Sequence, residues 1–184
     1  SDALIDAVVS LLKAGSIVAV KGLGGFHLVC DAANPEALAQ LRKRKRREGK
    51  AFACMVADVE AARAFCLVSE EEERLLTSPA RPIVLLKKNP SVQLAQGLAD
   101  GLTELGLMLP ATPLQHLLVR AFGGMLVMTS GNVHDEPIQT DDAQAVSALA
   151  GIADALLGNN RAILSRYDDS VLRVLNVGEG QTAV

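Results

Sequence analysis

Residues 34–56, NPEALAQLRKRKRREGKAFACMV, predict a capped helix followed by a buried strand. The Asn-Pro-Glu start supplies a side-chain cap, a proline at the first helical position and a carboxylate near the positive end of the helix dipole. Gly49 is typical of a helix terminus and indicates an end near Arg47. The apolar stretch 51–56 comes next, so this part of the chain favours an α/β fold.

The helix carries a concentrated basic run. Seven of the chain's 18 Lys and Arg residues lie between positions 42 and 50, although the formal net charge of the whole chain is −3. Leu38, Leu41 and Lys45 recur at spacings of three and four, which places Lys45 on the apolar face of the helix. An inward lysine favours an anion site over a solvated basic face. The same helical phase turns Arg44 and Arg46 outward and leaves Arg47 and Lys50 at the helix exit.

Composition indicates one soluble domain. A chain of 184 residues with 49% hydrophobic residues is long enough to bury a large core. No apolar run approaches the roughly 20 residues that cross a bilayer, and the start of the chain lacks signal-peptide features, so we expect a cytoplasmic protein. Cys30, Cys54 and Cys66 have no CxxC spacing, which fits a reducing compartment and no zinc site.

Helical and extended patterns alternate along the chain, which predicts a single α/β domain with a mixed sheet. The polar stretch 87–101 is expected to be a loop. The expected helices cover residues 2–14, 35–47, 58–65, 69–78, 112–121 and 140–149. The expected strands cover residues 16–20, 51–56, 82–86 and 125–128, with short tail strands at 163–164 and 171–177. Residues 105–109 are apolar.

A glycine-rich stretch, Lys21 to His27, follows the first expected strand. Glycines let backbone amides approach an anion, but they are equally typical of a tight turn. The stretch lacks the third glycine of a dinucleotide-binding fingerprint and the GK[ST] of a P-loop. It is therefore a candidate ligand-binding loop that matches neither of these two motifs.

The cysteines and histidines give little sign of nucleophilic or metal chemistry. His27 and Cys30 are three residues apart in an extended segment, so their side chains should point to opposite faces, and Cys30 is expected to be a buried structural residue. His116 lies in an apolar helix, as a core or interface residue. His134 belongs to a loop, and no spacing around these histidines suggests zinc.

Polar residues follow the expected strand 125–128. Thr129, Ser130 and Asn132 would cluster at the carboxyl end of that strand, where ligands commonly bind in α/β sheets, although Ser-Gly-Asn is also an ordinary turn sequence. Near the end of the chain, two arginines and two adjacent carboxylates could form a surface ion-pair patch or a second wall of an anion site with metal-binding capacity. These are Arg161, Arg166, Asp168 and Asp169.

Five ordered blocks resemble the YrdC-like domain of the HypF carbamoyltransferases of [NiFe]-hydrogenase maturation. They are KGLGGFHLVCDA, KRREGKAFACMV, LMLPATPLQHLL, MTSGNVHDEPI and NRAILSRYDDSVLR, and together they span nearly the whole chain. The Lys-x-Arg and Ser-x-Asn motifs of the wider YrdC family match Lys45 with Arg47 and Ser130 with Asn132. Relatives usually have a histidine just before the segment that matches residues 160–161, whereas this chain has Gly158 and Asn159.

The resemblance implies a twisted mixed sheet flanked by helices, with a positively charged cleft. It also implies that ATP, with magnesium, adenylates carbamate to carbamoyl-adenylate and pyrophosphate, and that Lys45 and Arg47 are the catalytic residues. The implied ATP and phosphate contacts are Lys45, Arg47, Lys50, Thr129, Ser130, Asn132, Arg161 and Arg166. The implied carbamate pocket consists of Lys21, Gly22, Gly24, Gly25 and His27, and magnesium is expected near Asp168 and Asp169.

The resemblance also implies partners. Carbamate would come from carbamoyl phosphate through an acylphosphatase domain, and the carbamoyl group would pass through a zinc-finger and transferase region of a parent chain to HypE. The sequence is thus expected to be one domain of a larger protein, or a stand-alone half-enzyme. A threonylcarbamoyl-adenylate synthase of tRNA modification and a double-stranded RNA-binding module are the alternatives. Acidic net charge and few aromatic residues argue against nucleic acid as a partner.

Overall fold

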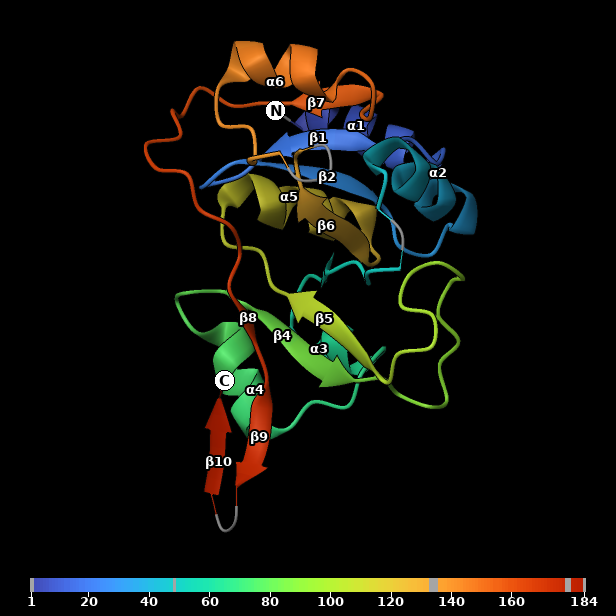
Figure 1. Cartoon of the computed structure of the whole chain (residues 1–184), viewed down its shortest axis with the longest axis vertical. Helices are drawn as coiled ribbons and strands as arrows, with labels where there is room; N and C mark the ends of the chain where they lie inside the picture. Colours follow the sequence, from blue (N-terminus) through green and yellow to red (C-terminus); the bar gives the residue numbers. More distant parts are fainter. Residues whose placement is uncertain (1, 48, 133–135, 178–179, 184) are drawn as a thin grey trace.

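An eight-stranded mixed sheet forms the centre of the molecule, with strand order β7-β1-β2-β6-β3-β5-β4-β8 (Figure 1). The computed structural model describes residues 2–47, 49–132, 136–177 and 180–183. The strands are β1 (Val18–Lys21), β2 (Phe26–Asp31), β3 (Cys54–Met55), β4 (Ile83–Lys87), β5 (Glu104–Met108), β6 (Leu126–Ser130), β7 (Ala155–Leu157), β8 (Val171–Leu172), β9 (Val174–Val177) and β10 (Gly180–Ala183).

The helices begin where the capping residues predict. Asn34, Ser69 and Thr112 each accept hydrogen bonds from the first turn of the helix that follows, and the last two complete capping boxes. The helices are α1 (Asp2–Lys13), α2 (Pro35–Lys45), α3 (Val59–Arg63), α4 (Glu70–Thr77), α5 (Pro113–Phe122) and α6 (Asp142–Leu149).

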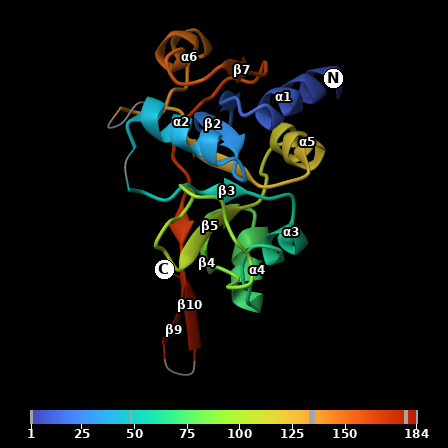
Figure 2. The same ribbon diagram turned by 90° about the vertical axis from the view of Figure 1, so that its right-hand side faces the viewer.

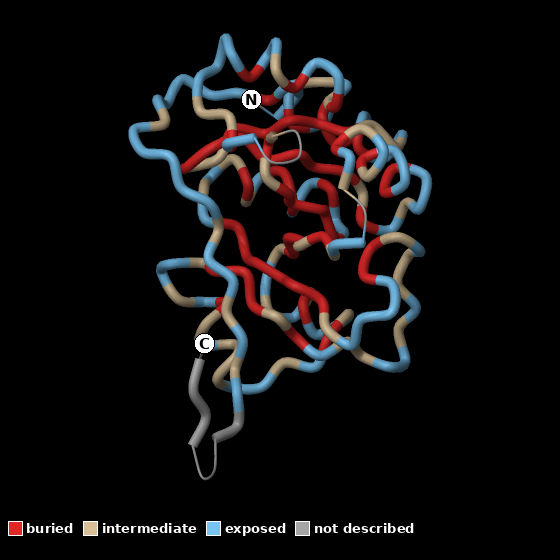
Figure 3. The backbone as a smooth tube through the Cα atoms, viewed as in Figure 1, coloured by how far each residue is buried: buried red, intermediate tan, exposed pale blue. Residues whose placement is uncertain are grey.

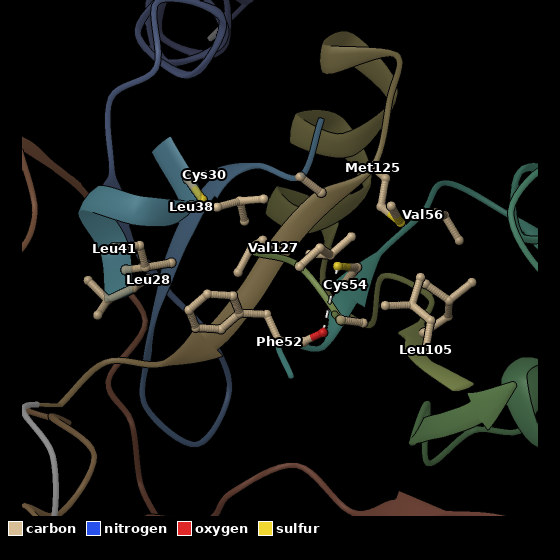
Figure 4. Close-up of a cluster of buried hydrophobic side chains, with 14 of the residues drawn as sticks. Leu28, Cys30, Leu38, Leu41, Phe52, Cys54, Val56, Leu105, Met125 and Val127 are labelled. Atoms are coloured by element: carbon tan, nitrogen blue, oxygen red, sulfur yellow. Dashed lines mark hydrogen bonds between the residues drawn. The ribbon is translucent and has the colours of Figure 1, made fainter. Parts of the chain in front are cut away.

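Two apolar layers lie on the two faces of the sheet. On one face, α1 and α5 pack against a cluster that includes Val18, Val29 and Leu126. On the other, α2 and α6 contribute to a cluster with Leu28 and Val127. Alternate residues of the central strands thus face different layers, as a sheet covered on both sides requires. Figure 3 shows the buried segments running through the middle of the fold, and Figure 4 shows the second cluster around Phe52.

The prediction of one α/β domain with a mixed sheet is confirmed. Parallel pairs join β1 to β7, β3 to β5 and β4 to β8, whereas the other pairs of the main sheet are antiparallel. The tail strands β9 and β10 pair only with each other and extend away from the main sheet in both views (Figure 1, Figure 2). Within the part of the chain that the structure describes, no helix has the length and apolar character needed to cross a membrane.

Three sequence predictions need correction. Strand β2, which pairs with both β1 and β6, was not predicted as a separate strand, and neither was β7 at the sheet edge. The predicted strand at residues 163–164 is wrong, because Leu164 is 94% exposed in an irregular segment. The helix expected at residues 140–149 begins at Asp142, because the carboxylate of Asp141 caps it by accepting from the amide of Gln144.

Replacement of Leu38 by alanine should lower the free energy of unfolding by roughly 2–5 kcal/mol, because a fully buried side chain leaves a cavity between α2 and the sheet. Urea unfolding followed by circular dichroism measures this change. Leu4→Ala is the matched control, since Leu4 is 52% exposed on α1 and should cost far less. Equal losses in the two variants would contradict the assigned packing of α2.

Candidate functional site

Lys45 is the last residue of α2, and its side chain is buried at the carboxyl end of β6. Only 2% of the residue is exposed. Its ammonium Nζ donates to the carbonyl oxygens of Ser130 (2.5 Å) and Asn132 (2.9 Å) and to the amide Oδ1 of Asn132 (2.6 Å). The Ser130 hydroxyl also donates to this Oδ1, at 2.8 Å. The two motifs singled out in the sequence therefore meet in space, and the prediction that Lys45 points inward is confirmed.

The chain reverses immediately after Lys45. Arg46 adopts a left-handed conformation (φ 53°), and its backbone N–H closes the helix by donating to the carbonyl oxygens of Arg42 and Lys43. The helix thus ends slightly before the predicted point. Glu48 lies outside the described residues. The reversal brings Arg47 back toward the site, where its Nη2 donates to the carbonyl of Ala51 at 3.1 Å.

Arg47 has an unused donor. Its Nε is buried without a hydrogen-bond partner among the described residues, which is costly unless something else fills the position. Its guanidinium lies 5.6 Å from the centroid of the Phe52 ring. Burial and the neighbouring Arg42 lower the pKa of Arg47, and Asp168 acts in the opposite direction. Arg47 therefore supplies a half-buried positive charge that can accept an anion.

Arg42 is a residue of the site that sequence reasoning missed. Its Nε donates to the carbonyl of Gly97 and its Nη1 to that of Lys50, each at 2.8 Å, while its guanidinium stacks 4.3 Å from the Phe52 centroid. Arg42 ties the end of α2 to two loops and holds the aromatic ring on which Arg47 also rests. The position of Arg42 in the basic run gave no indication of these contacts, because its partners lie in other segments of the chain.

Positive charge is concentrated here without matching carboxylates. Among the described residues, no carboxylate oxygen lies within 4.0 Å of the cationic nitrogens of Arg42, Lys45 or Arg47. Burial, and then the charge of Arg47, lower the pKa of Lys45 to about 8, and Asp168 partly offsets both effects. Such a cluster favours an anion. The predicted positively charged cleft as a surface feature stays a prediction.

The other predicted cations lie outside this cluster. Arg44 faces away from it and is held by the Asp154 carboxylate at 2.8 Å and by the carbonyl of Ile152. Lys50, Arg161 and Arg166 are exposed, and within the described residues none of the three side chains makes an ion pair or a hydrogen bond. The proposed phosphate contacts of these three residues stay predictions. Thr129 is buried within β6.

The glycine-rich stretch forms the hairpin between β1 and β2, closed by a hydrogen bond from Gly22 N to Gly25 O at 2.9 Å. Lys21 and His27 point to opposite faces of the sheet, because their neighbours alternate between the two apolar layers. The Lys21 ammonium, 4% exposed, lies 2.7 Å from the Asp142 carboxylate. Lys21 and His27 therefore do not line one pocket together. The carbamate pocket stays a prediction.

A long strap, residues 158–170, joins the two outermost strands of the sheet, β7 and β8, and so spans the width of the sheet, on the left in Figure 1. The carbonyl of Asn159 accepts from Lys21 at 3.2 Å. The backbone N–H of Tyr167 donates to Gly24 O at 3.3 Å. A Cβ on Gly24 would lie 2.5 Å from Tyr167 O, so the strap can approach this closely only over glycine.

The strap also supplies the carboxylate that holds His27. The imidazole Nε2 donates to the carboxylate of Asp169 at 2.8 Å. His27 lies directly opposite Ser130 across the β2–β6 pair. Strand alternation turns the His27–Asp169 pair toward the layer of Val29 and Leu126, whereas α2, which carries Lys45, covers the other face of the sheet. Beside His27 is a cavity of about 280 Å³, lined by Leu23, Gly24, His27, Met55, Pro79, Ala80, Arg81, Met108, Leu109, Ala111, Gln115, Tyr167 and Asp169.

The structure describes two of the three remaining cysteine and histidine predictions, those for Cys30 and His116. Cys30 is fully buried on the face opposite His27, as predicted, and burial raises the pKa of its thiol to about 12, so it is no nucleophile. His116 is half-buried in α5. His134 lies outside the described residues.

The described residues do not by themselves make a magnesium site. No cluster of three or more Asp, Glu, His or Cys side chains suited to a metal ion occurs among them. Asp169 is engaged by His27, and the carboxylate of Asp168 accepts from the backbone N–H of Asp169. The expected magnesium near Asp168 and Asp169 stays a prediction.

The Sua5/YciO/YrdC family model, described as "Telomere recombination", matches residues 10–182. The chain belongs to this family. It is 51% identical over 170 residues to the carbamoyltransferase HypF of Rhodobacter capsulatus, covering 92% of this chain and 23% of that protein. It is also 30% identical to the threonylcarbamoyl-AMP synthase of Bos taurus, covering 72% of this chain and 48% of that protein.

A solved structure of full-length HypF in the phosphate- and nucleotide-bound form matches the fold with a TM-score of 0.89 at 53% identity, over 92% of this chain and 27% of that one. The chain thus spans about a quarter of the length of the HypF proteins that it matches. These findings confirm the predicted resemblance to a YrdC-like domain similar to part of HypF.

The pKa of Lys45 generates a direct prediction. In the 184-residue chain, the Lys45 side-chain resonance, followed by NMR, should titrate with a midpoint near pH 8, because burial and Arg47 disfavour the ammonium. Arg47→Gln should raise that midpoint, since it removes a like charge, and Asp168→Asn should lower it. The variant Lys45→Arg identifies the resonance by its disappearance. Midpoint shifts of the opposite sign would contradict the charge arrangement described for this site.

Proposed function

We propose that this domain binds the triphosphate of ATP beside Lys45 and Arg47 and adenylates carbamate. A carbamate oxygen attacks the α-phosphorus, a new P–O bond forms, and the bond to the β-phosphate oxygen breaks. Its electron pair leaves with pyrophosphate, and carbamoyl-adenylate remains. No protein nucleophile is required, which fits the buried and inert state of Cys30.

One observation carries the proposal. Lys45 and Arg47 are buried or half-buried cations at a strand end, and the described residues offer them no carboxylate within 4.0 Å. Two such charges are unfavourable in a protein unless an anion joins them. A triphosphate brings several negative charges and many acceptor oxygens to one place. The site therefore suits a nucleotide better than it suits a neutral ligand.

The relatives supply the chemistry. The HypF proteins are carbamoyltransferases, and the solved full-length HypF contains phosphate and a nucleotide. By analogy, this domain would act in carbamoyl transfer during [NiFe]-hydrogenase maturation, with acylphosphatase, zinc-finger and transferase domains as its partners in a longer chain and HypE as the acceptor. Carbamate would come from carbamoyl phosphate. Magnesium would enter with ATP and neutralise part of its charge.

The surrounding residues would position the reactants and exclude water, because a carbamoyl-adenylate is a labile mixed anhydride. Ser130 and Asn132 would shape the phosphate end of the site. The cavity beside His27 is our candidate for the rest of the reactants, with Gly24 and the strap residues Tyr167 and Asp169 in its lining. The other proposed contacts are Thr129, Lys50, Arg161 and Arg166 for phosphate, and Gly22 for carbamate. Lys21 points to the other face of the sheet, where it pairs with Asp142, so it would act only indirectly.

A second candidate reaction follows from the 30% identity to a threonylcarbamoyl-AMP synthase. That enzyme class also forms an acyl-adenylate, so the same charge arrangement would serve it. The glycine-rich hairpin, where those synthases typically carry a proline-threonine-glutamate loop, favours carbamate instead.

The test measures pyrophosphate release from MgATP by the 184-residue chain. One arm contains ammonium carbamate and the other contains threonine with bicarbonate. Release in the carbamate arm alone is the expected result. Release only with threonine would assign the chain to the second reaction, and absence of both release and ATP binding would refute the proposal.

Lys45→Ala should reduce pyrophosphate release by roughly 10²-fold or more, because it removes a buried positive charge and the hydrogen bonds that hold Ser130 and Asn132. Lys43→Ala is the matched control, because Lys43 is an exposed lysine of the same helix and should leave the rate unchanged. Circular dichroism checks that both variants are folded. An unaltered rate in folded Lys45→Ala would contradict a role for Lys45 in the reaction.

A further inference from the structure

The Lys-x-Arg pair of this site contains two cations with different hydrogen-bond states. An ammonium has three N–H donors. In Lys45 these donors face the Ser130 carbonyl, the Asn132 carbonyl and the Asn132 amide oxygen at 2.5–2.9 Å. With 2% of the residue exposed, no donor of Lys45 is left for a phosphate.

The polar groups around Lys45 also hydrogen-bond to one another and to neighbouring backbone groups. The Ser130 hydroxyl donates to Asn132 Oδ1, and Asn132 Nδ2 donates to the carbonyl of Glu136. The backbone N–H of Gly131 donates to Phe26 O and that of Asn132 to Ser130 O. Lys45 is therefore the centre of a closed network that fixes the loop 130–132 against β2 and α2.

Arg47 differs in this respect. Among the described residues its guanidinium makes one hydrogen bond, from Nη2 to Ala51 O, while Nε is buried without a partner. Phe52 supports the guanidinium from one side, and Arg42 holds that ring in place. A positively charged group with open donors and a fixed orientation is what bidentate contact with a phosphate requires.

We infer that Lys45 is a positioning residue, which acts through the loop 130–132, and that Arg47 is the member of the pair that binds the phosphate. This division of roles rests on the proposed function and refines it. It predicts that loss of Lys45 affects turnover through a displaced loop, whereas loss of Arg47 affects nucleotide affinity directly.

Three measurements on the 184-residue chain separate the two roles. Amide hydrogen exchange reports the loop through the N–H groups of Gly131 and Asn132, calorimetry gives the Kd for MgATP, and pyrophosphate release with carbamate gives kcat and KM. The variants are Lys45→Met, Lys45→Arg, Arg47→Gln and the control Lys43→Met.

For Lys45→Met we expect loop exchange to accelerate by about tenfold or more and kcat to fall by roughly 10²-fold, with the MgATP Kd changed by less than about threefold. For Arg47→Gln we expect the Kd to weaken by roughly 10- to 100-fold, the usual cost of a charge-assisted hydrogen bond, with loop exchange unchanged.

The variant Lys45→Arg adds a second measurement, the pH dependence of kcat/KM, which a merely structural role of Lys45 would leave unchanged. In the unaltered chain, kcat/KM should decline above about pH 8 as the Lys45 ammonium, which also feels Arg47 and Asp168, loses its proton. An arginine stays protonated, so this variant should restore slower loop exchange relative to Lys45→Met and abolish the decline.

The inference is overturned if Lys45→Met weakens MgATP binding as much as Arg47→Gln does while loop exchange is unchanged. It is also overturned if Arg47→Gln leaves the Kd unaltered. If the unaltered chain does not bind MgATP, the proposed function and the role of Arg47 both fail. The exchange rates of Lys45→Met would still decide whether Lys45 positions the loop.

Discussion

The site depends on one buried hydrogen-bonded charge, the ammonium of Lys45 among the oxygens of the loop 130–132. Burying an ammonium is expensive unless its donors are satisfied, and the residual cost is visible in a pKa lowered to about 8. That cost constrains the fold, because α2 must end where Lys45 reaches β6 and the loop must turn its carbonyls inward. The left-handed Arg46 and the capped start of α2 meet the first requirement.

In the part of the chain that the structure describes, no nearby carboxylate neutralises Arg42 or Arg47, the arginines beside Lys45 in the site, and this has a physical explanation. Arg42 and Arg47 both lie over the ring of Phe52. Each would be stabilised by a carboxylate, yet none of the described residues places one within 4.0 Å of either guanidinium. A carboxylate bonded to Arg47 would compete with an anionic ligand for the same donors. Asp168 moderates the cluster from the strap without forming an ion pair with it. The protein thus keeps the attraction for an anion at some cost in stability.

Local signals in the sequence predicted what local forces determine. Asn34, Ser69 and Thr112 cap helices as expected, and the helical phase of Leu38 and Leu41 predicted that Lys45 points inward. The meeting of Lys45 with Ser130 came from the family resemblance, since 85 residues separate them and no periodicity links them. Arg42 was missed because its partners, Gly97 and Lys50, lie in loops whose paths depend on tertiary packing.

The sequence predicted strand pairing less well, because pairing also depends on tertiary packing. Residues 163–164 have apolar side chains suited to a strand, but no neighbouring strand is available to pair with them there, and Leu164 projects into solvent. Strand β2 was hidden by the preceding glycines, although strand alternation alone placed His27 and Cys30 on opposite faces. Had β2 been recognised, its hairpin register with β1 would also have separated Lys21 from His27.

The strap makes one side of the site depend on the full width of the sheet. It leaves the sheet at β7 and returns at β8, so its position depends on the whole width of the sheet being formed. Only then do Asn159, Tyr167 and Asp169 reach Lys21, Gly24 and His27. These contacts are few and mostly polar, whereas Lys45 is fixed by α2 and β6, which pack into the core. The side of the site around Lys45 is therefore the more firmly held one, and the side covered by the strap is the more weakly held one.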